Sequence, residues 1–174
     1  YNSNQYLINR LSKNGQRYLY YTVKEGLRKN LPVELSLIPF VESQFDPYAR
    51  SATGASGIWQ FIPSTARENG LKKNWWYDGR RDIVASTEAA YGFLSKLYER
   101  YGDWLIAIAA YNAGPSRIKK EIEKNKKNGL PTDFWSLNLP RETKAYVPKI
   151  LAIVELIRNP DNFNIQLPFL PNRP

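Results

Sequence analysis

The feature that most constrains the fold is an apolar run at residues 104–111, WLIAIAAY, which contains no charged side chain. A run of this length suits either a strand or a buried helix, but its alanine content and its helical neighbours favour a helix. A helix that is apolar on all sides belongs in the interior of a domain. Gly114 then provides a natural stop. We therefore predict a mainly α fold with a central buried helix.

Helical patterns lie on both sides of this run. Apolar residues recur at helical spacing from Asp82 to Tyr101, and Asp82 is a suitable cap for that helix. An N-terminal helical stripe is broken near Gly15, and residues 32–43 predict a helix that Pro39 kinks, because proline lacks a backbone donor. Further helices are predicted at residues 63–69, 115–129 and 141–158, with Pro148 bending or splitting the last.

The chain contains no Cys and no His. Their absence excludes disulfides, metal sites built on Cys or His, and nucleophilic catalysis of the Ser-His-Asp or Cys-His kind. Acid–base chemistry must therefore depend on Asp, Glu, Tyr or Lys. No apolar run approaches the length of a membrane-spanning helix. Met is absent even at position 1, so we expect a piece of a longer protein.

The net charge is +9, and the chain has 12 Tyr and 5 Trp. A basic surface suits a polyanionic partner, which leaves nucleic acid, an anionic membrane and a cell wall with peptide carboxylates as candidates. Aromatic side chains can stack on sugar rings, although many of them belong to the core.

Residues 35–62 have the pattern of a catalytic site. An apolar run ends at Glu42, a loop of small residues follows, and the segment closes on Trp59, Gln60 and Phe61. Burial raises the pKa of a carboxyl group, so an acid at the end of a buried segment can act as a general acid. Glu42 alone favours the plainer interpretation, a helix that ends with a solvated glutamate and enters an ordinary loop. The combination with the loop and Gln60 favours a functional site.

Several short motifs occur together with this pattern. They are ES at 42–43, Ser51, GASGIWQ at 54–60, AYNAG at 110–114 and RETKAYV at 141–147. In this order and spacing they resemble the family 1 lytic transglycosylases, or SLT domains, over well more than half of the chain. The surrounding IPFVES and WQFIPSTA are most similar to the D-type membrane-bound members.

The resemblance implies a lysozyme-like helical domain of the goose-lysozyme and SLT type, with Glu42 at the centre of a substrate groove. It implies a lyase that acts on peptidoglycan glycan strands. Such an enzyme breaks the β-1,4 bond between N-acetylmuramic acid and N-acetylglucosamine without water and leaves 1,6-anhydromuramic ends. One glutamate, Glu42, acts first as acid and then as base. The implied location is the periplasm or cell envelope, with an outer-membrane anchor as one option for the full-length protein.

The same resemblance implies a set of substrate-binding residues: Ser51, Gly57, Ile58, Gln60, Tyr111, Asn112, Glu142 and Tyr146. No metal and no cofactor are expected. Trp59 replaces a Met found in many members, and it either stacks on substrate or packs in the core. Residues 75–77, WWY, are either an aromatic wall near the groove or a plug over the core.

Two alternatives remain at this stage. A goose-type lysozyme would hydrolyse the same bond and would need a second carboxylate, for which the candidates are Asp46, Asp78, Asp82, Asp103 and Glu142. A non-catalytic module would bind peptidoglycan or another polyanion, although no nucleic-acid motif is present. We expect residues 1–159 to form the catalytic domain and residues 160–174 an extended arm or linker, with a further wall-binding module possible in the longer protein.

Overall fold

The computed structural model describes residues 3–170, which form helices and loops and, within that range, no strand. The prediction of a mainly α protein is confirmed. Isolated β-bridges occur at 50 with 56, 56 with 61, and 73 with 78. The helices are α1 (Ser3–Gly15), α2 (Leu19–Arg28), the 3-10 helix η1 (Val33–Leu37), α3 (Ile38–Ser43), α4 (Pro63–Glu68), α5 (Ile83–Tyr101), α6 (Trp104–Ala113), α7 (Pro115–Lys127), η2 (Phe134–Ser136), α8 (Arg141–Arg158) and η3 (Pro160–Phe163).

The chain divides into two compact units. Unit 1 comprises residues 1–91 and 150–174, and unit 2 comprises residues 92–149. The boundary falls within α5 and within α8, so each of these helices belongs partly to both units.

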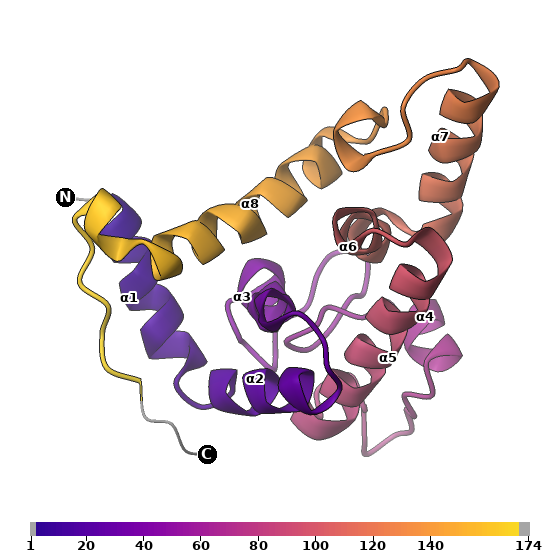
Figure 1. Ribbon diagram of the computed structural model, residues 1–174. Coiled ribbons are helices and arrows are strands. Elements are labelled where there is room, and N and C mark those ends of the chain that lie inside the picture. The colour runs from indigo at the N-terminus through magenta and orange to yellow at the C-terminus, as the bar shows by residue number, and fades with distance from the viewer. Residues whose placement is uncertain (1–2, 171–174) are drawn as a thin grey trace. The chain divides into compact units, whose positions relative to one another are not determined.

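In unit 1 the break predicted near Gly15 is confirmed, because α1 ends there and α2 begins at Leu19 as a separate helix (Figure 1). Gly15 is buried, and a Cβ at this position would lie 3.3 Å from the Phe45 ring. Farther along, the Tyr91 hydroxyl donates to the Thr22 carbonyl oxygen at 2.6 Å, which joins α5 to α2. Burial raises the pKa of this tyrosine, so it remains a donor at any ordinary pH.

The kinked helix predicted at residues 32–43 is wrong. The segment is instead a 3-10 turn, η1, followed by a separate short helix, α3, which begins at Ile38. Pro39 occupies the first turn of α3, where a backbone donor has no partner within the helix in any case. The proline therefore starts a helix here and does not distort one.

In unit 2 the predicted buried helix is confirmed as α6, where residues 106–110 are all buried. Asp103 caps it, accepting a hydrogen bond from the Ile106 amide at 3.0 Å. Helices α7 and η2 pack against α6. The buried Asn125 side chain donates to the carbonyl oxygens of Pro131 and Ser136 at 2.7 and 3.0 Å, which fixes the loop between α7 and η2.

Helix α8 runs uninterrupted from Arg141 to Arg158 with Pro148 inside it, so the proline does not split the helix (Figure 1). After η3 the chain runs back along α1, where the Gln166 amide donates to the Gln5 side-chain oxygen at 2.7 Å. Ile165 is buried. Residues 171–174 of the predicted arm lie outside the described residues.

Candidate active site

Glu42 lies in the last turn of α3, and its side chain is half-buried. The helix ends at this point because Gln44 and Phe45 both adopt left-handed backbone conformations, with φ of 55° and 61°. Their amides donate to the carbonyl oxygens of Phe40 and Pro39 at 2.9 and 3.2 Å. Phe45 is buried, and its ring centroid lies 6.5 Å from that of Phe40. The core therefore fixes the helix end that presents Glu42.

Ser43 joins this helix end to the glycine-rich loop. Its hydroxyl lies 2.9 Å from the Ile58 carbonyl oxygen and 3.1 Å from that of Pro39, and donates to both as a shared hydrogen bond. The residue next to Glu42 is thus hydrogen-bonded to the GASGIWQ loop, which the sequence analysis predicted to bind substrate. The motif contained Ser43, but its role could not be assigned from the sequence.

The loop itself requires glycine at position 57. Gly57 has φ +82°, and a Cβ there would lie 1.7 Å from the Arg80 carbonyl oxygen. Real Cβ atoms do not come within 3.0 Å of a backbone oxygen, so any side chain would displace the loop or the Arg80 segment. Gly54 has the same φ of +82°, but its Cβ direction is open. Gly57 therefore has a packing requirement that Gly54 lacks.

Gln60 and Ser51 both bond to the loop backbone. The Gln60 side-chain amide donates to the carbonyl oxygens of Gly57 and Ala49 at 2.8 and 3.2 Å. The Ser51 hydroxyl accepts from the Ala55 amide at 3.0 Å. Both polar residues predicted to contact substrate therefore also stabilise the conformation of the loop.

Arg80 is the strongest cross-link of this loop, and sequence reasoning missed its role. It is only 5% exposed, and its guanidinium donates to the carbonyl oxygens of Gly54 and Phe61 at 2.7 and 3.1 Å. Asp78 pairs with it through two bonds of 2.9 and 2.6 Å. The hydrogen bonds from Arg80 lower the pKa of the Asp78 carboxyl and raise that of the guanidinium. The aspartate two residues before the arginine was the only available signal.

The tryptophans have opposite environments. Trp59 is fully buried, and its indole nitrogen donates to the Thr87 hydroxyl at 2.9 Å. Its ring meets that of Tyr91 edge-on, with centroids 5.2 Å apart, so it packs in the core and does not stack on a substrate. Trp75 and Trp76 are 89% and 90% exposed, which excludes the interpretation that they plug the core.

The carboxylates considered as second acids are mostly engaged in the structure. Asp46, Asp82 and Asp103 accept hydrogen bonds from backbone amides two or three residues further along, at 2.8, 2.8 and 3.0 Å. Asp82 thereby caps α5, as predicted. Asp78 is paired with Arg80.

In unit 2, a hydrogen bond joins the AYNAG and RETKAYV segments. The Thr143 hydroxyl donates to the Asn112 side-chain oxygen at 2.8 Å, and Thr143 is buried. The Tyr111 ring lies 5.7 Å from that of Phe93, centroid to centroid. Gly114 ends α6 with φ 89°. Thr143 is a further residue of the site region that sequence reasoning did not single out.

Glu142 and Tyr146 follow Thr143 on α8 with the four-residue spacing that places them on one side of the helix. Glu142 is exposed and Tyr146 is buried.

The predicted site residues thus form two groups. The structure brings the helix end of Glu42 together with Ser51, Gly57, Ile58 and Gln60 in unit 1. It separately joins Asn112 to the start of α8 in unit 2, where Tyr111, Glu142 and Tyr146 also lie.

Among residues 3–170, no group of three or more Asp or Glu side chains is placed to hold a metal ion. None of the helices in the described range is both long and apolar enough to span a membrane.

Comparison with known proteins identifies the family. The family described as "Transglycosylase SLT domain" matches residues 20–132, which is more than half of the chain and includes Glu42, Gln60 and Asn112. The chain therefore belongs to the transglycosylase SLT domain family.

Among individual relatives, the chain is similar to membrane-bound lytic murein transglycosylase D of Escherichia coli K12. The two are 46% identical over 169 residues, which cover 97% of this chain and 37% of the relative. It is also 30% identical over 108 residues to membrane-bound lytic murein transglycosylase F of Desulfosudis oleivorans, covering 58% of this chain and 22% of that protein. The chain thus spans little more than a third of the first relative, whose name agrees with the predicted D-type resemblance.

A similar solved structure is that of an inactive glutamate-to-glutamine mutant of lytic transglycosylase Slt from Pseudomonas aeruginosa. The TM-score is 0.59 with 28% sequence identity, over 84% of this chain and 24% of Slt. The fold is accordingly the mainly α, lysozyme-like fold that the sequence predicted.

Proposed function

We propose that this chain is a lytic transglycosylase domain that cleaves peptidoglycan glycan strands, with Glu42 as its only acid–base group. The observation that supports this most directly is the Ser43 bond to Ile58, because it fastens the end of α3 to the loop of the GASGIWQ motif. The catalytic carboxyl group and the substrate loop are thereby held together by the protein itself. The structural neighbour Slt is inactive in a form with glutamine in place of one glutamate, which agrees with a glutamate at the centre of the chemistry.

In the first step Glu42 donates its proton to the oxygen between N-acetylmuramic acid and N-acetylglucosamine. The bond from this oxygen to C1 of the muramic residue breaks, and N-acetylglucosamine leaves with a hydroxyl group. The acetamido group of the muramic residue assists departure by sharing the positive charge that develops at C1.

In the second step the Glu42 carboxylate removes the proton from the muramic 6-hydroxyl, and that oxygen bonds to C1. The carboxyl group regains its proton, and the product has a 1,6-anhydro ring. The attack is intramolecular, so its effective concentration is high once the ring is held in the required pucker. No water is consumed.

The environment of the four aspartates among the five candidate second acids supports a mechanism with one acid. A hydrolase would need a second carboxylate that is free to position water or to attack the sugar. Asp46, Asp82 and Asp103 accept backbone hydrogen bonds, and Asp78 is paired with a buried arginine. Each of the four therefore has a structural role in its own segment.

We assign substrate contacts to both groups of site residues. Among residues 3–170 the Gln60 side-chain oxygen has no hydrogen-bond donor, while its amide is bound to the loop, so the oxygen can accept from an acetamido N–H. The backbone of Gly57 and Ile58 supplies further hydrogen bonds. In unit 2, Tyr111, Asn112 and Tyr146 contact the sugars. Two residues orient these groups: Ser51 in unit 1 and Glu142 in unit 2.

The two alternatives lead to different products. A goose-type lysozyme would hydrolyse the same bond and leave a reducing muramic end, and a binding module would release nothing. Digestion of purified sacculi in water enriched in heavy oxygen, followed by mass spectrometry, separates all three. We expect muramic ends about 18 mass units lighter than hydrolytic ones and free of heavy oxygen, because no water enters the product. Heavy oxygen at the new muramic end would favour the lysozyme.

The wider role follows from the relatives. We assign catalysis to residues 1–159 and a linking role to residues 160–174. The E. coli relative is named as membrane-bound, and this chain covers 37% of it, so we place the activity in the cell envelope with further modules in the longer protein.

A further inference from the structure

The loop between α4 and α5 presents two exposed aromatic rings in a fixed backbone. Trp75 and Trp76 are 89% and 90% exposed. The Asn74 side-chain oxygen accepts from the backbone amides of Trp76 and Tyr77 at 2.9 and 2.7 Å, and the backbone amide of Asn74 donates to the Tyr77 carbonyl oxygen at 2.8 Å. A pair of ordered, solvent-facing tryptophans is typical of a binding surface, because such rings gain from being covered.

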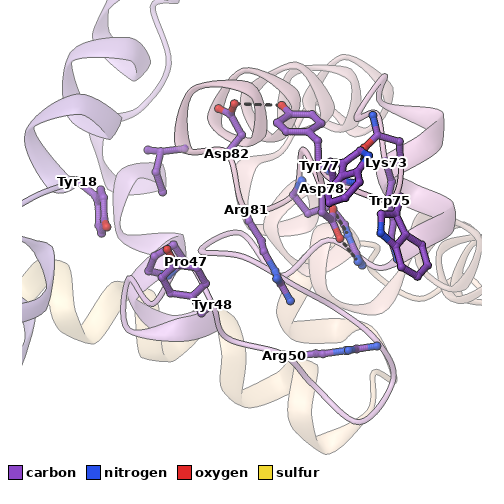
Figure 2. Close-up of a pocket in the computed structure, with 14 residues that line it drawn as sticks. Tyr18, Pro47, Tyr48, Arg50, Lys73, Trp75, Tyr77, Asp78, Arg81 and Asp82 are labelled. Carbon is purple, nitrogen blue, oxygen red and sulfur yellow. Dashed lines mark hydrogen bonds and ion pairs between the residues drawn. The ribbon is translucent and has the colours of Figure 1, made fainter.

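These rings border a hollow of about 600 Å³ (Figure 2). Tyr48, which is 75% exposed, and Trp75 lie on opposite sides in this view, and the side chains of Arg50 and Arg81 lie between them. The residues that line this hollow do not include Glu42 or the other predicted site residues of unit 1.

A second hollow, of about 1010 Å³, adjoins the first at Trp75. Arg67, Leu71 and Lys72 line it, and it shares Lys73 and Trp75 with the first hollow. The two hollows therefore adjoin, and the Trp75 indole lines both of them. We call the two adjoining hollows the Trp75 surface.

The charges on the Trp75 surface favour an anionic ligand. Within residues 3–170 neither Arg50 nor Arg81 forms an ion pair, and the Arg81 guanidinium donates to the Ser56 hydroxyl at 3.3 Å. The two acids that line the Trp75 surface are engaged, Asp78 with a buried arginine and Asp82 as the cap of α5. Two guanidinium groups thus remain to bind carboxylates, for which their planar geometry is suited.

We propose that the Trp75 surface binds a stretch of peptidoglycan away from the bond that is cut, with its aromatic rings against sugars and with Arg50 and Arg81 on carboxylates of the stem peptides. Two adjoining hollows suit a chain-like ligand, and two arginines between the Tyr48 and Trp75 rings match a polymer of sugars with acidic branches (Figure 2). This inference rests on the proposed function, because that function supplies the polymer. A phospholipid membrane fits less well, since the cations line a hollow together with two acids and do not project from a convex face.

The test is binding to insoluble sacculi by co-sedimentation, in a chain that also has Glu42→Gln so that the sacculi are not consumed. We expect Trp75→Ala to weaken binding about tenfold, since truncation of an aromatic anchor commonly costs more than 1 kcal/mol. Arg50→Gln with Arg81→Gln should weaken it by a similar factor. Matched controls are Trp135→Ala and Arg100→Gln, which remove an exposed tryptophan and an exposed arginine from unit 2. The controls should bind as the parent does.

Unchanged binding of the Trp75 variant to sacculi would overturn the inference. The inference would also be overturned if Trp75→Ala weakened binding to vesicles of anionic phospholipid, or to single-stranded DNA, but did not weaken binding to sacculi. Release of anhydromuropeptides by the chain with Glu42 intact is measured in parallel. If the chain releases anhydromuropeptides but Trp75→Ala does not change binding, only the assignment of the Trp75 surface is rejected. If the chain releases no anhydromuropeptides, the proposed function is rejected.

Discussion

Replacement of Gly57 by alanine should damage both the fold and the activity, and Gly54 offers a matched control. Both glycines have φ +82°, so alanine at either position must accept a left-handed backbone, at a cost of about 1–2 kcal/mol. Only at Gly57 does the added Cβ meet an atom, the Arg80 carbonyl oxygen at 1.7 Å. That separation must grow to at least 3.0 Å, so the loop or the Arg80 segment has to move by more than an ångström.

The clash should add about 1–3 kcal/mol to the loss of stability, as overpacking in a tight site does. A displacement of about 1 Å at a positioning segment can lower turnover by about 10²-fold. Urea unfolding followed by circular dichroism, with muropeptide release from sacculi as the activity assay, measures both effects. We expect Gly54→Ala to show the smaller loss of stability and near-normal turnover. Equal stability of the two variants, together with unchanged turnover in Gly57→Ala, would refute the packing argument.

Three further substitutions test the parts around the loop. Ser43→Ala removes the bond to Ile58 and should lower kcat more than KM while costing about 0.5–1.5 kcal/mol in urea unfolding; an unchanged kcat contradicts a positioning role. Asp78→Asn leaves the buried Arg80 without a charged partner and should lower the free energy of unfolding by about 3–5 kcal/mol. A urea midpoint within error of the wild-type value would argue that the Asp78–Arg80 pair does not stabilise the loop. Because Arg80 lowers the Asp78 pKa in the folded state, this stabilisation is present above the unfolded carboxyl pKa of about 3.9 and is lost as the pH falls through the lower folded value. The acid-induced fall in wild-type stability should thus be shallower in Asp78→Asn. Trp59→Phe should reduce stability through loss of a buried hydrogen bond while leaving KM unchanged, and a raised KM would indicate substrate contact.

Much of the fold could be predicted because local chemistry determines it. The apolar run at residues 104–111 permits only a buried element, and α6 is one. Asp82 likewise marks a helix start through its carboxylate, and Gly15 marks a helix end through the backbone freedom that comes with having no side chain. Such features depend on few neighbours, so the sequence alone indicates them.

The error at Pro39 has a different origin. The same proline can kink a long helix or open a short one, and the choice depends on whether the preceding residues form an α-helix or a 3-10 turn. Core packing of the η1 residues Leu35 and Leu37, both buried, settles that choice. The sequence pattern alone does not indicate how these leucines pack.

The candidate site could be predicted only in part for a similar reason. Motif resemblance predicted Glu42 and its loop as the site, but the residues that support that loop come from elsewhere in the chain. Arg80 lies 26 residues from Gly54, to which it donates, and nothing in its local sequence indicated that this cation is buried. Thr143 and Asn112 are 31 residues apart. Long-range hydrogen bonds of this kind become evident only in the folded chain.

The most direct measurement of the central claim is the rate of muropeptide release by Glu42→Gln, compared with the same kind of change at Asp46, the next acid along the sequence. Glutamine keeps the shape of the side chain but cannot donate or accept the reacting proton. Since one group serves both proton transfers, we expect turnover to fall by at least about 10²–10⁴-fold with circular dichroism unchanged, and Asp46→Asn to retain most of its activity. Retention of more than about a tenth of the wild-type rate by Glu42→Gln would contradict the assignment, because loss of a general acid–base group cannot be so mild.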